Sequence, residues 1–322
     1  MLPLRGIARR LTRSQSAEIF VYPHLGGTDL GFARILGTGL GNLLLPWARA
    51  IIAARRNRWT PLFPTWPQLK VGPLLRRERD ARLYSGLFRC PPDYVGSPRR
   101  LLLLLRGPRV GEGVAVDRVA PGSVVVFRGL QDGFRSILEE HELVRRELLA
   151  MVRVEHLHHF RPKDPVAIGI HVRLGDFRQV SQPGVPEPGI ASYGDRLPLD
   201  WYVEALGNLR RALGPVPALV FSDGSNSDLD ALLRLPGVQR FDSGSPLGDL
   251  LALASVRVLI GSISTFSMWA TYLGRMPTVW RRSEEPTALL YDRPGAEASV
   301  APGDGLPEAF LALARAAIGP RE

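Results

Sequence analysis

The second half of the chain alternates short apolar runs with segments whose apolar residues recur at helical spacing. The runs are rich in Val, Ile and Leu, as buried strands are, and they lie at residues 166–172, 218–221, 238–241, 256–260 and 278–280. Helical patterns lie between them at residues 200–213, 226–233, 247–254 and 265–273, the first with Asp200 as its expected cap. Such alternation is typical of a parallel, doubly wound sheet with right-handed crossovers. We therefore predict an α/β, Rossmann-like domain in residues 161–322.

The first half is less regular, but we expect a second domain of the same kind. At about 150 residues per domain, 322 residues suggest two domains. The expected N-terminal lobe covers residues 1–160, with a proline-containing hinge at 161–165. Its expected elements are strands at 32–36 and 123–127, a helix from the glycine turn to about residue 54, a short buried element at 101–105 and a long helix at 134–158. Beyond residue 281 we expect a loop and then a helix near 306–318, packed on either domain.

Composition limits the classes of function. The chain has one cysteine, Cys90, which excludes an intrachain disulfide and a multi-thiolate zinc site. Its net charge is +10, and all but two of its 41 basic residues are arginines. This excess indicates either an anionic ligand or surface or a coding bias spread over the surface. A nucleic-acid-binding protein is a weaker alternative, because the arginines are dispersed and not interleaved with aromatic residues.

No apolar run reaches the roughly 18 residues that span a bilayer. Residues 1–16 carry four arginines and no acidic residue, and they lack the apolar region of a signal peptide. Such a basic arm either lies on anionic lipid or frays into solvent.

Polar residues follow three of the predicted strands. Because the carboxyl ends of parallel strands share one edge, where ligands of such sheets bind, these residues predict a nucleotide site. Arg173 would neutralise a diphosphate, the hydroxyls and helix amides at Ser264 and Thr265 would hold phosphate oxygens, and Asp223 would accept hydrogen bonds from a base. The alternatives are helix capping by Ser264 and Thr265, a turn or cap at Asp223, and an ion pair between Arg173 and Asp176. The full group is His171, Arg173, Gly175, Asp176, Ser222, Asp223, Gly224, Ser262, Ser264 and Thr265.

Two further motifs have competing interpretations. The turn Gly37–Gly41 resembles half of a dinucleotide fingerprint, but residues 55–58 are Arg-Arg-Asn-Arg where NAD binding needs an acidic residue. An NADP-dependent oxidoreductase is therefore an alternative function. A second interpretation is that the glycines, which lack side chains, let the backbone of another ligand approach closely. His156, His158 and His159 lack the partners of a zinc motif, which favours a structural role.

Four segments together resemble a known family. HVRLGDF (171–177) is similar to the HxRxGD segment of the α-1,2-fucosyltransferases and their α-1,6- and O-fucosyltransferase relatives. GTGLGN with WARA (37–50) resembles their GGLGNQ segment, FSDG (221–224) their FSDD, and residues 250–274 their stretch around NSTFSWW. The order of the segments is that of the family. The chain departs from the pattern at Leu43, Leu174, Gly224 and Met268, which replace Gln, Arg, Asp and Trp.

The resemblance implies a GT-B-like fold of two Rossmann-like lobes with a cleft between them, the first lobe on the acceptor side. It implies an inverting, metal-independent transfer, with fucose passing from GDP-fucose to a glycan hydroxyl. A sugar-nucleotide-binding relative without catalysis is a further alternative. We expect a cytoplasmic protein that contacts the inner membrane peripherally.

By the same resemblance, Arg173 binds the β-phosphate and His171 and Asp223 approach the guanosine. The catalytic candidates are Arg173, His171 and Asp176, and the candidates for the base are His171, Asp176, Glu187 and Asp195. The donor-binding residues implied are Gly39, Gly41, Asn42, His171, Arg173, Ser222, Asp223, Ser264, Thr265 and Phe266.

Overall fold

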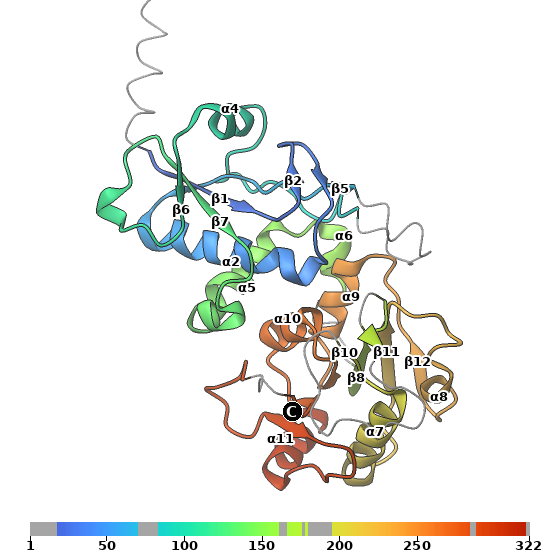
Figure 1. Ribbon diagram of the computed structural model, residues 1–322. Helices are drawn as coiled ribbons and strands as arrows, with labels where there is room; N and C mark the ends of the chain where they lie inside the picture. The colour runs from blue at the N-terminus through green and yellow to red at the C-terminus, as the bar shows by residue number, and fades with distance from the viewer. Residues whose placement is uncertain are drawn as a thin grey trace, which may run out of the picture. The chain divides into compact units, whose positions relative to one another are not determined.

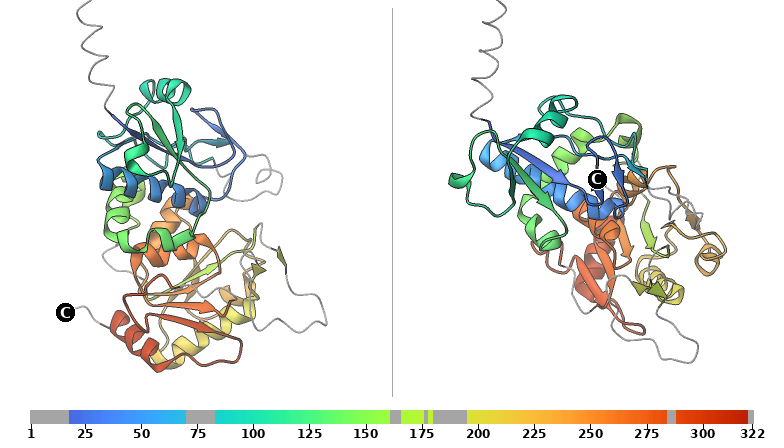
Figure 2. Two further views of the ribbon diagram at one scale, coloured as in Figure 1. Left: turned by 60° about the vertical axis from the view of Figure 1, so that its left-hand side comes forward. Right: turned by 45° about the horizontal axis from the view of Figure 1, so that its top comes forward.

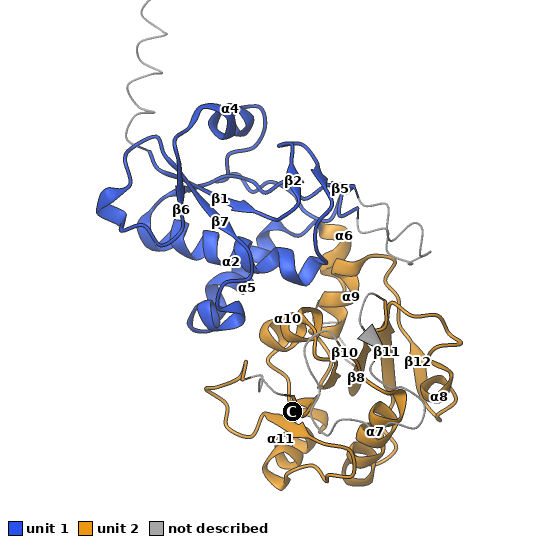
Figure 3. Ribbon diagram, in the orientation of Figure 1, with its two compact units in different colours: residues 1–72, 82–153 blue, residues 73–81, 154–322 orange. Residues whose placement is uncertain are grey.

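The structure is a computed structural model that describes residues 18–69, 83–160, 166–175, 178–179, 195–283 and 288–319. It divides into two compact units (Figure 3): unit 1 comprises residues 1–72 and 82–153, and unit 2 comprises residues 73–81 and 154–322. No helix in the described part of the chain is both long and apolar enough to cross a membrane.

Unit 1 is built on a parallel four-stranded sheet in the order β4-β1-β7-β6. The strands are β1 (Phe20–His24), β4 (Thr60–Pro61), β6 (Arg109–Gly111) and β7 (Val124–Arg128). The long helix α2 (Leu40–Asn57) packs on β1 and β7, and α5 (His141–Met151) packs on α2 (Figure 1). The predicted helix after the glycine turn and the predicted strand at 123–127 are thus confirmed.

Three other expectations for the first half are wrong in detail. The strand expected at 32–36 shrinks to β3 (Arg34–Ile35), which lies antiparallel to β2 (Thr28–Asp29) and parallel to β5 (Gln68–Leu69) in a separate small sheet. The element at 101–105 is helix α4 (Arg99–Arg106), but only Arg100 and Leu104 of it are buried.

The expected helix at 134–158 is interrupted. It separates into the 3-10 turns Gly133–Ser136 and Leu138–Glu140, followed by α5 and the short α6 (Val154–Leu157). Outside this segment, another 3-10 turn covers Val116–Arg118. The break follows α5, where Val152 is extended and bridges to Phe88 and the N–H of Arg153 donates to Leu87 O. A contact with a distant segment therefore overrides the local helical pattern.

Unit 2 contains a six-stranded, wholly parallel sheet in the order β12-β11-β8-β13-β14-β15. Numbered along the chain, this is the order 3-2-1-4-5-6 of a Rossmann sheet, so the predicted doubly wound sheet is confirmed. The strands are β8 (Ile168–Val172), β11 (Ala218–Ser222), β12 (Val238–Arg240), β13 (Val258–Gly261), β14 (Thr278–Arg281) and β15 (Glu297–Val300). The strand β15 lies where the sequence predicted only a loop. A separate parallel pair joins β9 (Arg178–Gln179) and β10 (Asp195–Arg196).

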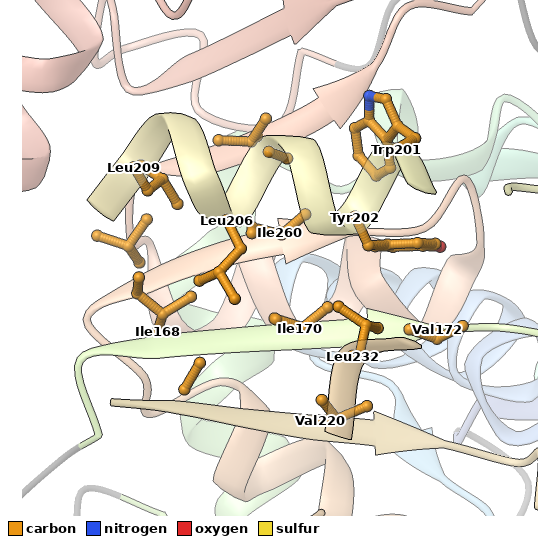
Figure 4. Packing of buried hydrophobic residues seen from close by; sticks show 14 of the residues in the cluster. Ile168, Ile170, Val172, Trp201, Tyr202, Leu206, Leu209, Val220, Leu232 and Ile260 are labelled. Carbon is orange, nitrogen blue, oxygen red and sulfur yellow. The ribbon is translucent and has the colours of Figure 1, made fainter. Parts of the chain in front are cut away.

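Helices cover both faces of this sheet. They are α7 (Leu199–Leu213), α8 (Asp230–Leu233), α9 (Pro246–Leu253), α10 (Thr265–Gly274) and α11 (Glu308–Ile318). On one face, the apolar stripe of α7 packs on side chains of β8, β11 and β13 (Figure 4), and α11 packs on α7. On the other, the absence of a side chain at Gly169 makes room for Leu253 of α9 and for Val256. The expected cap at Asp200 is wrong, because Pro198 is the N-cap of α7.

Candidate functional site

In the sheet of unit 2, β8 and β13 lie side by side at the centre. The chain adds β11 and β12 on the side of β8, and it adds β14 and β15 on the side of β13, so the strand order reverses between β8 and β13. At such a switch point the crevice beyond the carboxyl ends of the strands is the usual ligand site. Three predicted segments lie there: residues 173–175 after β8, 222–224 at the end of β11 and 262–264 after β13. The structure therefore brings these segments to one edge of the sheet.

Asp223 fastens the loop after β8. Its Oδ2 pairs with Nη1 of Arg173 at 2.8 Å. Its Oδ1 accepts the N–H of Leu174 at 2.9 Å, and Oδ2 also accepts the N–H of Gly175 at 3.1 Å. Charge-assisted bonds of this kind are stronger than neutral ones. The partner of Arg173 in this pair is thus Asp223, whereas the alternative partner Asp176 lies outside the described residues.

Two glycines make this close approach possible. A Cβ on Gly175 would lie 2.4 Å from Oδ2 of Asp223, so a side chain there would push the carboxylate away. A Cβ on Gly224 would lie 2.5 Å from Cδ1 of Leu174, so the leucine packs directly over this glycine. The two departures from the family pattern at 174 and 224 therefore touch each other.

Two arginines that the sequence analysis did not single out brace the same loops. Nη2 of Arg240, at the end of β12, donates to the carbonyls of Ser222 (3.0 Å) and Gly224 (2.7 Å). Nη2 of Arg196, in β10, donates to Gly175 O at 3.0 Å. For Arg240, the position in the predicted strand at 238–241 was the signal available in the sequence. Arg196 gave no such signal, because β10 belongs to a separate pair of strands. With Asp223, the two arginines hold the loops of β8 and β11 in one arrangement.

His171 lies in a buried cluster of serine hydroxyls. Its Nδ1 is 2.7 Å from Oγ of Ser267 and 2.9 Å from Oγ of Ser262, and 3.5 Å from Oγ of Ser264. Burial, followed by the nearby charge of Arg173, lowers the pKa of His171 well below its ordinary value. The imidazole is therefore neutral at pH 7, and its Nδ1 is engaged by hydroxyls.

Helix α10 begins at this cluster of serines. Oγ of Ser264 accepts the N–H of Ser267 and caps the helix, so the capping alternative holds for Ser264. Thr265 and Phe266 are half-buried in the first turn, and the Phe266 ring stacks on His171 with centroids 4.9 Å apart. A ten-residue helix with no acidic residue in its first turn presents its positive end here.

The predicted donor-binding residues of the first lobe lie at the start of α2 in unit 1. Gly39 is the N-cap without a side-chain bond, its carbonyl accepts the N–H of Asn42 at 3.0 Å, and Gly41 is buried. Oδ1 of Asn42 is buried with no hydrogen-bond partner among the described residues. Gly37 has a φ of +134°, and a Cβ there would lie 2.6 Å from Oε1 of Gln68.

The geometry opposes the dinucleotide interpretation of this turn. A fingerprint needs a sheet strand directly before the glycines, whereas the strand here is the two-residue β3 of the small sheet. The arginines proposed for a 2′-phosphate are paired with carboxylates instead: Nε of Arg55 is 2.9 Å from Glu147 and Nε of Arg56 is 2.8 Å from Glu140.

The remaining candidates are dispersed. Asp195 is buried in β10, and Asp176 and Glu187 lie outside the described residues. Nδ1 of His156 is 3.1 Å from Oγ of Ser245, the cap of α9, and His159 meets Phe241 edge to face. Within the described ranges, no three His, Cys, Asp or Glu residues are grouped as metal ligands would be.

The chain is similar to known proteins over about half of its length. Residues 120–281 match the family model described as Glycosyl transferase family 11. The galactoside alpha-(1,2)-fucosyltransferase 1 proteins of Lagothrix lagotricha and Ateles belzebuth are each 28% identical over 169 residues, which is 50% of this chain and 43% of each relative. The chain thus spans less than half the length of these curated relatives.

A solved structure of NodZ alpha-1,6-fucosyltransferase soaked with GDP-fucose aligns with a TM-score of 0.50 and 14% identity, over 84% of this chain and 97% of that one. At this identity the likeness concerns the fold. With the parallel sheets of the two units, it confirms the predicted GT-B-like class with Rossmann-like lobes.

Proposed function

The chain belongs to glycosyl transferase family 11, and from this premise we propose that it transfers fucose from GDP-fucose to a hydroxyl of a glycan. The transfer is an inverting single displacement in which the acceptor oxygen forms a bond to the anomeric carbon while the bond to the β-phosphate oxygen breaks. GDP leaves with the electron pair, and the acceptor hydroxyl loses its proton to a base. The names of the relatives and of the neighbouring structure support this donor.

The position of Arg173 is the observation that carries the proposal. Its guanidinium lies at the switch point of the sheet, is about one-fifth exposed, and is held by Asp223. A guanidinium carries five N–H donors in a planar fork that matches the oxygens of a phosphate. A fixed cation at the leaving oxygen stabilises the charge that develops there. The N-terminus of α10 adds a second positive end at the same edge.

We assign Asp223 to positioning and not to base recognition. Its two oxygens already accept three N–H groups of residues 173–175, and a carboxylate offers about four acceptor positions. We likewise assign His171 to positioning, because the serine hydroxyls engage its Nδ1 and connect it to the cap of α10. Ser222 supports the loop through the bond from the N–H of Gly224 to its Oγ (3.0 Å).

Acceptor activation requires a base. Of the carboxylates considered, Asp195 is the one that lies among the described residues, buried at the start of β10. In this proposal Arg173 and the α10 amides supply the positive charge at the diphosphate, and no metal is needed. We place the reaction in the cytoplasm, a reducing compartment that suits a chain with one cysteine.

Parallel calorimetric titrations with GDP, GDP-fucose, UDP and NADPH test the proposal. We expect GDP and GDP-fucose to bind, and to raise the Tm as a ligand of the native state must, while UDP and NADPH bind at least tenfold more weakly. Transfer to a panel of galactosides should persist in EDTA. Preferred binding of NADPH would refute the donor assignment. Binding of GDP-fucose without transfer or hydrolysis would instead show a non-catalytic relative.

A further inference from the structure

Helix α4 of unit 1 exposes leucines where a surface helix normally carries polar residues. Leu105 is 81% exposed and Leu102 is 49% exposed, while Arg100 and Leu104 on the opposite side are buried. The helix lies at the edge of unit 1 in each view (Figures 1 and 2). Exposed apolar clusters on a folded domain mark interaction sites more often than isolated apolar residues do.

The loop between β2 and β3 extends this surface. It carries Phe32, 68% exposed, and Leu30, 46% exposed. A Cβ on Gly31, between them, would lie 2.4 Å from Cδ2 of Leu101, so the loop lies directly against α4. We call Leu30, Phe32, Leu102 and Leu105 the apolar face.

Arg100 makes the loop and the helix one rigid element. Its guanidinium donates to Gly31 O, to Phe63 O at 2.6 Å and to Pro64 O at 3.2 Å. The exposed leucines are therefore fixed by the structure and do not depend on a flexible segment.

Arginines border the apolar face. At 100° per residue, Arg99 and Arg106 fall beside Leu102 on the exposed side of α4, and the exposed Arg109 donates to Leu104 O at the end of the helix. Glu18 pairs with Arg99 at 2.9 Å. Arg99, Arg106 and Arg109 are all exposed, so the border of the apolar face carries positive charge.

We propose that the apolar face and its arginine border bind an anionic lipid surface. The leucines and Phe32 enter the boundary between headgroups and acyl chains, and the arginines contact lipid phosphates, as amphipathic helices do at membranes. A second copy of the chain is a poorer occupant, because a two-fold contact would place the same arginines against each other. This inference does not rest on the proposed enzymatic function.

Flotation with vesicles of phosphatidylcholine alone, or mixed with phosphatidylglycerol, tests the proposal. The full chain should bind the mixed vesicles and bind phosphatidylcholine alone at least tenfold more weakly. Leu105→Glu should weaken binding about tenfold, since it removes an apolar contact and adds a repelled charge. Val154→Glu is the matched control: Val154 is 75% exposed, lies in unit 2, and should change nothing.

A second pair separates charge from general instability. Arg106→Glu should weaken binding, whereas Arg234→Glu, at a residue of unit 2 that is 79% exposed, should not. The Tm and GDP titration of each variant show whether it is folded. Absence of binding to mixed vesicles at low salt would overturn the proposal, as would equal binding by the Leu105 and Val154 variants. Dimerisation of the full chain that Leu105→Glu abolishes would also overturn it, in favour of a second copy.

Discussion

The buried arginines of unit 1 and Arg173 of unit 2 use the same side chain for different purposes. In unit 1, the fully buried Arg34 donates to the carbonyls of Thr65 (2.7 Å) and Leu25 (2.9 Å), and Arg100 likewise binds carbonyls. In unit 2, Arg173 is partly exposed at the edge of a parallel sheet and pairs with the carboxylate of Asp223. The first arrangement satisfies backbone acceptors, and the second presents positive charge to solvent.

This difference shows why the arginine content alone could not locate the site. Burial lowers the pKa of Arg34, while the charge of Asp29 opposes that shift, and its guanidinium serves the fold. Only the neighbours of each arginine separate a structural role from an anion-binding one. Variants of arginines in the two units should therefore separate effects on folding from effects on ligand binding.

The largest expected effect is on turnover at Arg173. Arg173→Ala should reduce kcat about 10²–10³-fold, the usual loss when one preorganised donor to a developing charge is removed, and should leave the Tm nearly unchanged. Steady-state transfer assays and thermal unfolding measure the two quantities. Near-normal transfer by the folded variant would rule out the proposed role.

The opposite pattern is expected at Arg34. Arg34→Met should lower the free energy of unfolding by about 3 kcal/mol, because several buried carbonyls lose their donors. The affinity of the folded variant for GDP should not change, since the proposed site is in unit 2. Denaturant unfolding and calorimetry check both. A loss of GDP affinity without loss of stability would break the distinction between the two units.

Asp223 should show an intermediate effect. Asp223→Ala should lower kcat about tenfold, since the loop amides and Arg173 lose their shared acceptor. Asp223→Asn retains one acceptor oxygen and should recover part of that loss. Comparing kcat and KM for both variants measures the effect. A positioning role predicts a change mainly in kcat, so an effect on guanine-nucleotide affinity alone would point to base recognition instead.

The most gradual effect concerns pH, and it compares His171 with His24 of unit 1. The folded-state pKa of His171 is lowered to about 3, so below the ordinary value of 6.5 the unfolded chain takes up a proton that the folded chain does not. Stability is therefore lost as the pH falls from 6.5 towards 3, with a slope of at most about 1.4 kcal/mol per pH unit.

Burial also lowers the pKa of His24, which is only half-buried, so its share of the slope should be smaller. Urea unfolding between pH 4 and 7 should give a flatter profile for His171→Asn than for His24→Asn. Equal slopes in the two variants would contradict the buried, neutral state of His171.

The sequence predicted unit 2 better than unit 1 for a physical reason. The helices of unit 2 and the strands from β8 to β14 of its main sheet carry their own apolar patterns, whereas β15 does not. Because parallel strand ends share an edge, local information placed Arg173 and Asp223 at the same edge. In unit 1, the strand β1 and the break after α5 depend on distant segments: β1 pairs with β7, about 100 residues away, and Val152 bridges to Phe88. The periodicity of apolar residues along the sequence gives no information about either of these contacts.

The roles within the site were harder to predict than its place. The approach of Asp223 to the guanine base stays a prediction. Its partners in the structure are Arg173 and the amides of residues 174 and 175, nearly 50 positions earlier in the chain, and local sequence does not show these contacts. The serines around His171 also come from distant parts of the chain: Ser262 follows β13, and Ser264 and Ser267 lie at the start of α10.

The contact between Leu174 and Gly224 constrains how this site can evolve. Because a Cβ at 224 would lie 2.5 Å from Cδ1 of Leu174, a side chain at 224 requires Leu174 to rotate away or the loop that carries the guanidinium to move. Among homologous sequences the two positions should therefore covary: an apolar residue at 174 should accompany glycine at 224, and the arginine of the family pattern should accompany its aspartate.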